Sequence, residues 1–232
     1  MAERPIFIPW TIEHRLVKEV SFDFQWNPGF APVQKKKNIT ALHEAAAADG
    51  YSPLLEFSTK SEELLGQRLS AFSLKVTAQE FGEIPLECAF QGSKVFERGG
   101  PFTDLYTAEP RAAKKDPRIR TSGCLVEFRY NGVTFPLKPK TAFYDWLYIT
   151  ALSPHHKYLQ CLEEYAGFTD IEFNPSKSVN CQARSCAMLA AMIKKDILQS
   201  SIQSPAAFIT AVSPDSADQP HSSMDESNLF GC

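Results

Sequence analysis

The sequence predicts an α+β protein, a mainly helical single domain with a small antiparallel sheet. Residues 17–26 alternate apolar and polar side chains, which is typical of a half-buried strand. Residues 124–137 place Asn131-Gly132 between β-branched and aromatic residues, which indicates a hairpin closed by a type I′ turn. Residues 179–200 are rich in small side chains and predict a helix that packs closely against a neighbour.

The remaining elements follow from the same kinds of signal. We expect extended segments at residues 4–9, 54–57, 69–76 and 168–173. We expect further helices at residues 41–49, 84–97, 141–152 and 154–165. Asn38 or Thr40 can cap the first of these helices, and Gly50 ends it.

The chain of 232 residues is long enough for one sizeable domain with an appendage. We expect residues 1–50 to form an N-terminal extension packed on the core and residues 51–212 to form the main domain. After Val212 the sequence is rich in serine, aspartate and proline and poor in apolar residues. Such a segment buries too little apolar surface to fold, so we expect residues 213–232 to be a disordered tail.

Composition excludes several functions. The net charge of −3 gives no general basic field for holding long nucleic acid, so any DNA or RNA contact would be local, through residues 35–37 or 111–115. No N-terminal apolar region and no apolar run of membrane-spanning length occurs, which predicts a cytoplasmic protein without a membrane contact. The cysteines form no CxxC pair and no zinc-like spacing with histidine, so we expect neither a metal nor a cofactor.

The chemistry-bearing residues centre on residues 84–97, with the sequence IPLECAFQGSKVFE. If this stretch is one helix, Glu87, Gln91 and Lys94 stand at positions i, i+4 and i+7 and project from one face. A carboxylate, an amide and an amine in this arrangement make either a surface salt-bridge ladder or the floor of a polar pocket. Their spacing does not distinguish the two.

Three other polar clusters accompany this stretch. Residues 58–61 form a loop of serine, threonine and lysine between two predicted strands, where binding groups are often carried. Asp170 and Glu172 lie in an aromatic extended segment. Residues 180–184 open the last predicted helix, whose N-terminus is suited either to an anion or to ordinary capping.

In this order the four clusters resemble the NADAR (YbiA-like) family, which is named for NAD and ADP-ribose. The family pattern is a serine-containing loop, an S-x-F strand and a helix reading E-x-x-F-Q-x-x-K, followed by a late aspartate and an asparagine that opens the last helix. The matching residues here are Ser58, Ser70-Ala71-Phe72, Glu87 to Phe96, Asp170 and Asn180. The resemblance covers residues 54–200. Where the family commonly has Trp-Gly after the aspartate, this chain reads Ile171-Glu172-Phe173, which indicates a divergent branch.

The resemblance implies an N-glycosidase that breaks a bond to ribose. Members remove ADP-ribose from modified guanine in nucleic acid or nucleotides, with antitoxin, repair or phage-defence roles, and this implies a possible toxin partner. Other members cleave phosphoribosyl-amine intermediates of riboflavin synthesis. A non-catalytic module that binds ADP-ribose or a related nucleotide is a further alternative. So is a defence component that acts by protein contact through residues 1–50 and the tail.

The residue types suit glycosidic cleavage. Breaking the C–N bond develops positive charge at ribose C1, which a carboxylate stabilises, while the leaving nitrogen gains a proton. A lysine of lowered pKa can instead attack C1 and form a Schiff base. We therefore expect Lys94 to act as nucleophile or electrostatic group and Asp170 or Glu87 as acid or base.

We expect the remaining site residues to hold the ligand. Gln91 would orient the ribose hydroxyls, and Phe90 or Trp146 would stack on a base. The candidates for phosphate or ribose contacts are Ser58, Lys60, Asn180 and Arg184.

Overall fold

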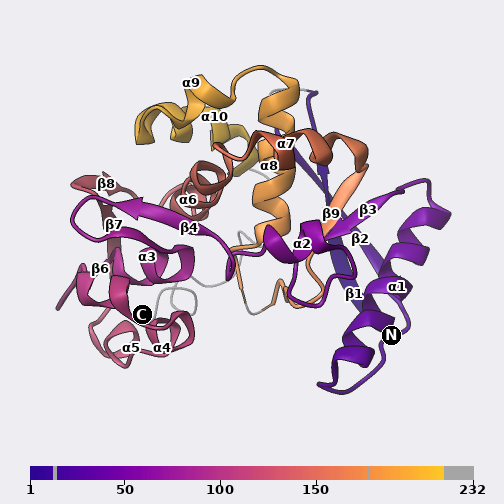
Figure 1. Cartoon of the computed structure of the whole chain (residues 1–232), viewed down its shortest axis with the longest axis horizontal. Coiled ribbons are helices and arrows are strands. Elements are labelled where there is room, and N and C mark those ends of the chain that lie inside the picture. Colours follow the sequence, from indigo (N-terminus) through magenta and orange to yellow (C-terminus); the bar gives the residue numbers. More distant parts are fainter. Residues whose placement is uncertain (13–14, 177, 217–232) are drawn as a thin grey trace. The chain divides into compact units, whose positions relative to one another are not determined.

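The computed structural model describes residues 1–12, 15–176 and 178–216, and it confirms the α+β class (Figure 1). Contacts within the chain divide it into two compact units. Unit 1 comprises residues 1–70 and 152–199, and unit 2 comprises residues 71–151 and the chain from residue 200 onward.

Unit 1 is built on a four-stranded sheet in the order β2-β1-β9-β3. Its strands are β1 (Ala2–Pro9), β2 (Val17–Phe24), β3 (Leu54–Glu56) and β9 (Gly167–Thr169). β1 pairs antiparallel with both β2 and β9, in agreement with the expected antiparallel sheet. β3 pairs with β9 in parallel, so this sheet is mixed. The N-terminal strands thus belong to the same sheet as β3 and β9.

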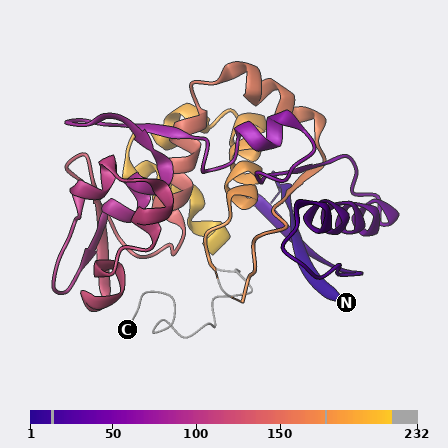
Figure 2. The same ribbon diagram turned by 60° about the horizontal axis from the view of Figure 1, so that its bottom comes forward.

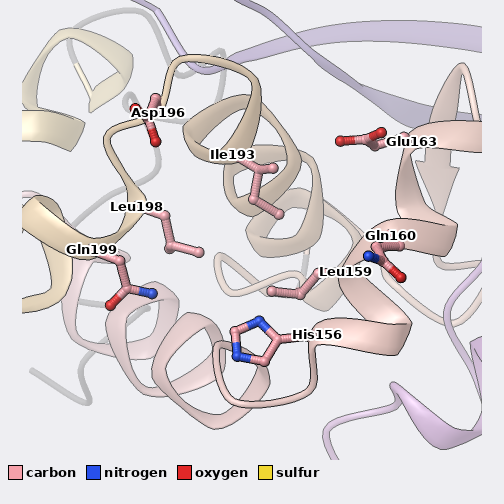
Figure 3. A pocket seen from close by; sticks show the side chains of 8 residues that line it. All are labelled: His156, Leu159, Gln160, Glu163, Ile193, Asp196, Leu198 and Gln199. Carbon is pink, nitrogen blue, oxygen red and sulfur yellow. The ribbon is translucent and has the colours of Figure 1, made fainter.

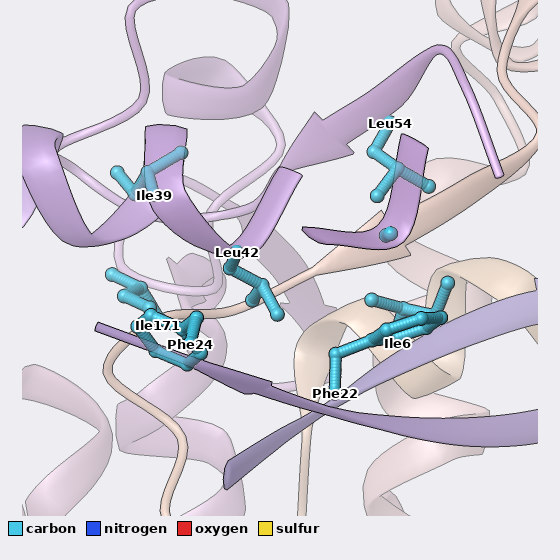
Figure 4. Close-up of a cluster of buried hydrophobic side chains, with 8 residues drawn as sticks. Ile6, Phe22, Phe24, Ile39, Leu42, Leu54 and Ile171 are labelled. Carbon is cyan, nitrogen blue, oxygen red and sulfur yellow. The ribbon is translucent and has the colours of Figure 1, made fainter. Parts of the chain in front are cut away.

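Helix α1 (Pro32–Ala48) covers one face of this sheet. Figure 2 shows it lying along the β1–β2 hairpin. Alternation in β2 buries Phe22 and Phe24, which pack with Ile39 and Leu42 of α1 in one apolar cluster (Figure 4). This burial anchors the hairpin on α1, because removing apolar side chains from water is the main favourable term in folding.

The start of α1 differs from the prediction. The helix begins at Pro32, nine residues before the expected start, because proline is well suited to the first helical position. Asn38 is therefore not a cap. It is buried inside the helix, accepts a hydrogen bond from the Asn27 backbone N–H at 2.7 Å and donates to the Asn27 carbonyl at 3.0 Å. The basic residues 35–37 lie within the helix rather than at its entry.

Helices complete unit 1: α2 (Leu64–Arg68), α7 (His156–Cys161), the 3-10 turn η2 (Leu162–Glu164) and α8 (Gln182–Lys194). Helix α9 (Leu198–Ile202) begins in unit 1. The predicted helix 179–200 is therefore wrong in its bounds. It starts at Gln182 and is interrupted after Lys194, where Asp196 adopts a positive φ of 54° that no helix accommodates. Asn180 lies before the helix rather than in its first turn.

Unit 2 contains a two-stranded sheet of β4 (Lys75–Ala78) and β5 (Gly82–Pro85), and a three-stranded sheet of β6 (Lys94–Phe96), β7 (Leu125–Tyr130) and β8 (Val133–Phe135). Both are antiparallel. The predicted hairpin is confirmed: Asn131 and Gly132 have φ values of 49° and 75°, as a type I′ turn requires. The predicted helix 141–152 is confirmed as α6 (Ala142–Leu152).

The remaining elements of unit 2 are α3 (Leu86–Gly92), η1 (Thr103–Thr107), α4 (Pro110–Lys114), α5 (Arg118–Thr121) and α10 (Pro205–Ser216). Helix α10 includes the first four residues of the predicted disordered tail. The rest of that predicted tail, residues 217–232, lies outside the described residues.

Two predictions in residues 69–97 are wrong. The expected strand 69–76 is displaced to β4, and Ser70 to Phe72 form a turn. The expected helix 84–97 ends at Gly92, and residues 94–96 form β6. Lys94 pairs with Phe128 of β7, so hydrogen bonding to a distant strand decides the conformation that local periodicity assigned to a helix.

Gly92 at the end of α3 leaves room for Tyr106. A Cβ at this position would lie 2.6 Å from Tyr106 Cε1 and 2.9 Å from the Phe102 carbonyl oxygen. Tyr106 is buried and its hydroxyl lies 3.0 Å from Ser93 Oγ, so it cannot move aside freely. We expect Gly92→Ala to lower the free energy of unfolding by about 1–3 kcal/mol. Urea unfolding would measure this, and an unchanged midpoint would contradict it.

Candidate functional site

The first candidate group lies in unit 2, at the junction of α3 and β6. Gln91 Nε2 donates to Glu87 Oε1 at 2.9 Å, and Lys94 Nζ donates to Gln91 Oε1 at 2.8 Å. The Gln91 amide thus uses both of its ends to connect the carboxylate to the amine. Glu87 and Gln91 are buried, with 7% and 5% of their surface exposed. The hydrogen-bonded series Glu87, Gln91 and Lys94 is therefore not a salt-bridge ladder exposed to solvent.

Lys94 is half-buried on β6. Its Nζ lies 4.9 Å from the centre of the Phe90 ring. The pKa of Lys94 is lowered to about 8, mainly by burial, while the Glu87 charge opposes this shift and the Lys114 charge adds to it. A lysine with such a pKa carries an appreciable neutral fraction near pH 7, and a neutral amine is a nucleophile.

The charge of Glu87 is one of the influences on the pKa of Lys94, so substituting Glu87 should change that pKa. Replacing Glu87 with glutamine removes the negative charge that raises the pKa of Lys94, so we expect that pKa to fall below about 8. Competitive chemical labelling of lysines followed by mass spectrometry across a pH series would measure the shift. The labelling of Lys75, an exposed lysine paired with Glu83 in the same unit, is the control and should be the same in both proteins. A Lys94 pKa that rises or stays constant in Glu87→Gln would contradict the prediction.

The predicted base-stacking residues lie in the aromatic core of unit 2. Phe90 is 8% exposed and stacks on Phe128 and Phe143, with ring centres 5.5 and 6.1 Å apart. Trp146 packs on Phe135 of the hairpin and donates its ring N–H to the Ile202 carbonyl at 3.4 Å. Their contact with a base stays a prediction.

The second candidate group lies in unit 1, where the chain leaves β9. Asp170 Oδ1 accepts hydrogen bonds from the backbone N–H groups of Glu172 and Phe173, at 3.0 and 3.2 Å. Its Oδ2 accepts from Gln182 Nε2 at 2.9 Å. Burial raises the pKa of Asp170 to about 7, and the Glu56 charge adds to the rise against the Gln182 hydrogen bond. A carboxyl with this pKa can hold and deliver a proton at neutral pH.

Glu56 is a site residue that sequence reasoning missed. It is 2% exposed, and its carboxylate accepts hydrogen bonds from the Thr169 hydroxyl at 2.7 Å and from the Ile171 backbone N–H at 2.9 Å. Burial raises the pKa of Glu56, while these bonds and one from Ser58 lower it. The available signal was a lone carboxylate in the otherwise apolar strand Leu54–Phe57, whose burial requires partners.

The predicted ligand-binding residues of unit 1 lie close to these carboxyls in the chain. Ser58 is buried, contacts Glu56, and its Oγ accepts the Lys60 backbone N–H at 3.1 Å. Arg184 is buried on α8. Asn180 Oδ1 is buried and finds no hydrogen-bond donor among the described residues. Because such an acceptor is costly to bury, it is a suitable point for a ligand hydroxyl.

The structure thus joins the predicted residues in two groups. Glu87, Phe90, Gln91 and Lys94 contact one another in unit 2, whereas Ser58 and Asp170 are connected through Glu56 in unit 1. Within the described residues, histidine, cysteine, aspartate and glutamate side chains form no cluster able to hold a metal ion.

A comparison with protein families decides the identity of the chain. The family model described as DarT1-associated NADAR antitoxin matches residues 2–222. The chain belongs to this family. The NADAR resemblance read from residues 54–200 is therefore confirmed. No curated protein matches the chain.

The match extends the family pattern beyond the residues that carried the resemblance. It includes β1, β2 and α1, so the N-terminal part of the sheet belongs to the region shared by DarT1-associated NADAR antitoxins. No helix in the described part of this NADAR chain is long and apolar enough to cross a membrane.

A surface pocket of about 270 Å³ lies elsewhere in unit 1 of this NADAR protein (Figure 3). Leu159, Ile193 and Leu198 lie between polar side chains that include His156 and Asp196. His156 is exposed. None of the residues predicted to form the active site lines this pocket.

Proposed function

We propose that this NADAR antitoxin is an N-glycosidase that removes ADP-ribose from modified guanine in nucleic acid or nucleotides. The observation that carries the proposal is Lys94, a half-buried lysine whose pKa is lowered to about 8 and whose amine is connected through Gln91 to Glu87. Burying a lysine beside a carboxylate costs free energy, and such arrangements are concentrated at functional sites. Family membership supports ribose chemistry as the use of this amine.

In the proposed reaction the neutral Lys94 amine attacks ribose C1. The C–N bond to guanine breaks, its electron pair leaves with the base, and the sugar opens to a Schiff base on Lys94. Water then hydrolyses the Schiff base and releases ADP-ribose. Glu87 stabilises the positive charge that develops, and Gln91 holds the amine in place and orients ribose hydroxyls.

We assign the proton transfer to Asp170. A carboxyl with a pKa of about 7 is protonated often enough at neutral pH to supply the proton that the leaving guanine requires. Asn180 Oδ1 has no hydrogen-bond donor in the described part of the chain, and we propose that it accepts a hydrogen bond from a ribose hydroxyl. The proposed phosphate and loop contacts are Ser58, Lys60 and Arg184, and the proposed base contacts are Phe90 and Trp146.

The proposed biological role is to reverse the modification made by a toxin. The family name associates these antitoxins with DarT1, which supports a toxin as the functional counterpart. Neutralisation by catalysis requires no stable toxin complex, because removing the modification is sufficient. Local contacts with DNA or RNA are proposed for residues 35–37, which lie on α1, and for residues 111–115, which lie on α4 and its C-cap Lys115.

The deciding experiment mixes the full chain with an oligonucleotide that carries ADP-ribose on guanine. We expect free ADP-ribose and unmodified oligonucleotide, measured by chromatography and mass spectrometry. Tight binding without release would instead favour a non-catalytic reader of ADP-ribose. A parallel reaction with a phosphoribosyl-amine precursor of riboflavin tests the other family chemistry, and turnover of that compound alone would refute the guanine assignment.

A further inference from the structure

Glu56 contacts the chain on both sides of Asp170. Its Oε2 accepts the hydroxyl proton of Thr169, the residue before Asp170, at 2.7 Å. Its Oε1 accepts the backbone N–H of Ile171, the residue after Asp170, at 2.9 Å. The parallel pairing of Glu56 with Thr169 across β3 and β9 fixes this geometry. The carboxyl of Asp170 is thus held by a clamp on its two neighbours.

A side chain of α1 also contacts this clamp, through Thr169. His43 Nε2 lies 2.8 Å from Thr169 Oγ1. Because the single Thr169 hydroxyl proton is donated to Glu56, Nε2 must carry the proton that His43 shares with Thr169. Burial lowers the pKa of His43 to about 4, so the ring is neutral at pH 7. His43 thus donates to Thr169, and Thr169 donates to the Glu56 carboxyl.

We propose that Glu56 is a positioning residue for the reaction proposed above, holding the Asp170 segment and keeping Asp170 in its proton-bearing form. Every group that Glu56 contacts in this network is a hydrogen-bond donor. A carboxylate, which only accepts, satisfies them all, whereas an amide would turn its NH₂ group against a donor. The charge so stabilised lies close to Asp170 and opposes loss of the Asp170 proton.

Other charges around Asp170 are weaker or absent at neutral pH. His43 on α1 is neutral, and burial raises the pKa of the Cys181 thiol before α8, so that thiol is neutral as well. Glu172 also raises the pKa of Asp170, but its side chain is 46% exposed and its charge is screened.

Unit 1 also contains cationic side chains, of which Lys35 contacts this segment. Lys35 of α1 lies 3.9 Å from Glu172 and offsets its charge. Arg184 of α8 is buried in the same unit. Glu56 is thus the buried negative charge that acts on Asp170.

The test uses the full chain with Glu56→Gln, and Glu172→Gln as the matched control. Carbon-13 NMR of aspartate carboxyls, with Asp170→Asn to assign the signal, gives the Asp170 pKa without any turnover. We expect a pKa about one unit or more lower than in the wild type for Glu56→Gln and a smaller decrease for the control. The alkaline limb of the pH profile of kcat/KM should move down by the same amount.

The outcomes separate the two proposals. A wild type that releases no ADP-ribose refutes the glycosidase, yet the NMR titration still decides the role of Glu56. An active Glu56→Gln with an unshifted Asp170 pKa overturns the positioning role alone, as does a loss of activity with an unshifted pH profile. If Glu56→Gln does not fold, Thr169→Val removes one donor from Glu56 with little change in shape. It should lower the Asp170 pKa in the same direction, and an unchanged value would refute the proposal.

Discussion

Replacing Lys94 with alanine is expected to reduce ADP-ribose release at least ~10²-fold, the range seen when a group that stabilises transition-state charge is removed. The loss is larger if Lys94 forms the Schiff base, because the reaction then has no nucleophile. Lys94→Arg should not restore activity, since a guanidinium stays protonated at neutral pH. Release from a modified oligonucleotide under saturating and subsaturating substrate would separate an effect on kcat from one on KM.

The matched control for this experiment is Lys75→Ala, which removes an exposed, ion-paired lysine of the same unit and should leave release unchanged. Cyanoborohydride reduction during turnover tests the covalent route. We expect an adduct of ADP-ribose on Lys94 in the wild type and none in Lys94→Ala. Full activity of Lys94→Ala would remove Lys94 from the mechanism, and activity loss without a trapped adduct would assign it an electrostatic role.

Replacing Asp170 with asparagine is expected to reduce kcat about 10²–10⁴-fold, the usual contribution of a general acid. In the wild type, release should decline above about pH 7 as Asp170 loses its proton and decline below about pH 8 as Lys94 gains one. Activity should follow the product of the protonated fraction of Asp170 and the neutral fraction of Lys94. This product gives a narrow bell-shaped pH profile with its maximum between pH 7 and pH 8. Asp170→Asn should abolish the alkaline limb, measured as kcat/KM across pH 5–10.

Glu172→Gln is the control for Asp170, because it removes a neighbouring exposed charge and should leave most of the activity. The substitution of Asp170 also has a stability signature. The folded pKa of about 7 exceeds the ordinary value of 3.8, so the folded protein holds this proton more tightly than the unfolded chain. The wild type therefore loses stability relative to Asp170→Asn as pH rises from about 4 to about 7. Equal pH dependence of unfolding in the two proteins would contradict the buried-acid assignment.

Local patterns predicted the elements that depend on near neighbours. The Asn131-Gly132 hairpin and helix 142–152 were predicted correctly, because a turn that requires positive φ and a long apolar helix are encoded within a few residues. The alternation of residues 17–26 predicted β2 and its buried face. The order of the polar clusters predicted the family.

The conformation of residues 94–96, which depends on a distant partner, was mispredicted. The stretch 84–97 has helical spacing, yet residues 94–96 form β6 because β7 supplies their hydrogen bonds from more than 25 residues away. The hydrogen-bonded chain of Glu87, Gln91 and Lys94 nevertheless survives, since a seven-residue helix followed by a strand still brings the three side chains together.

By itself, the sequence determined the α+β class, the family and the residue types suited to glycosidic chemistry. Tertiary structure decided which of those side chains have shifted pKa values. Lys94 and Asp170 have shifted pKa values because burial removes water from their charged forms, and no sequence spacing reports burial. The same holds for Glu56: the residues next to it are apolar, and two of its donors, Thr169 of β9 and the Ile171 backbone N–H just after β9, come from more than 100 residues later.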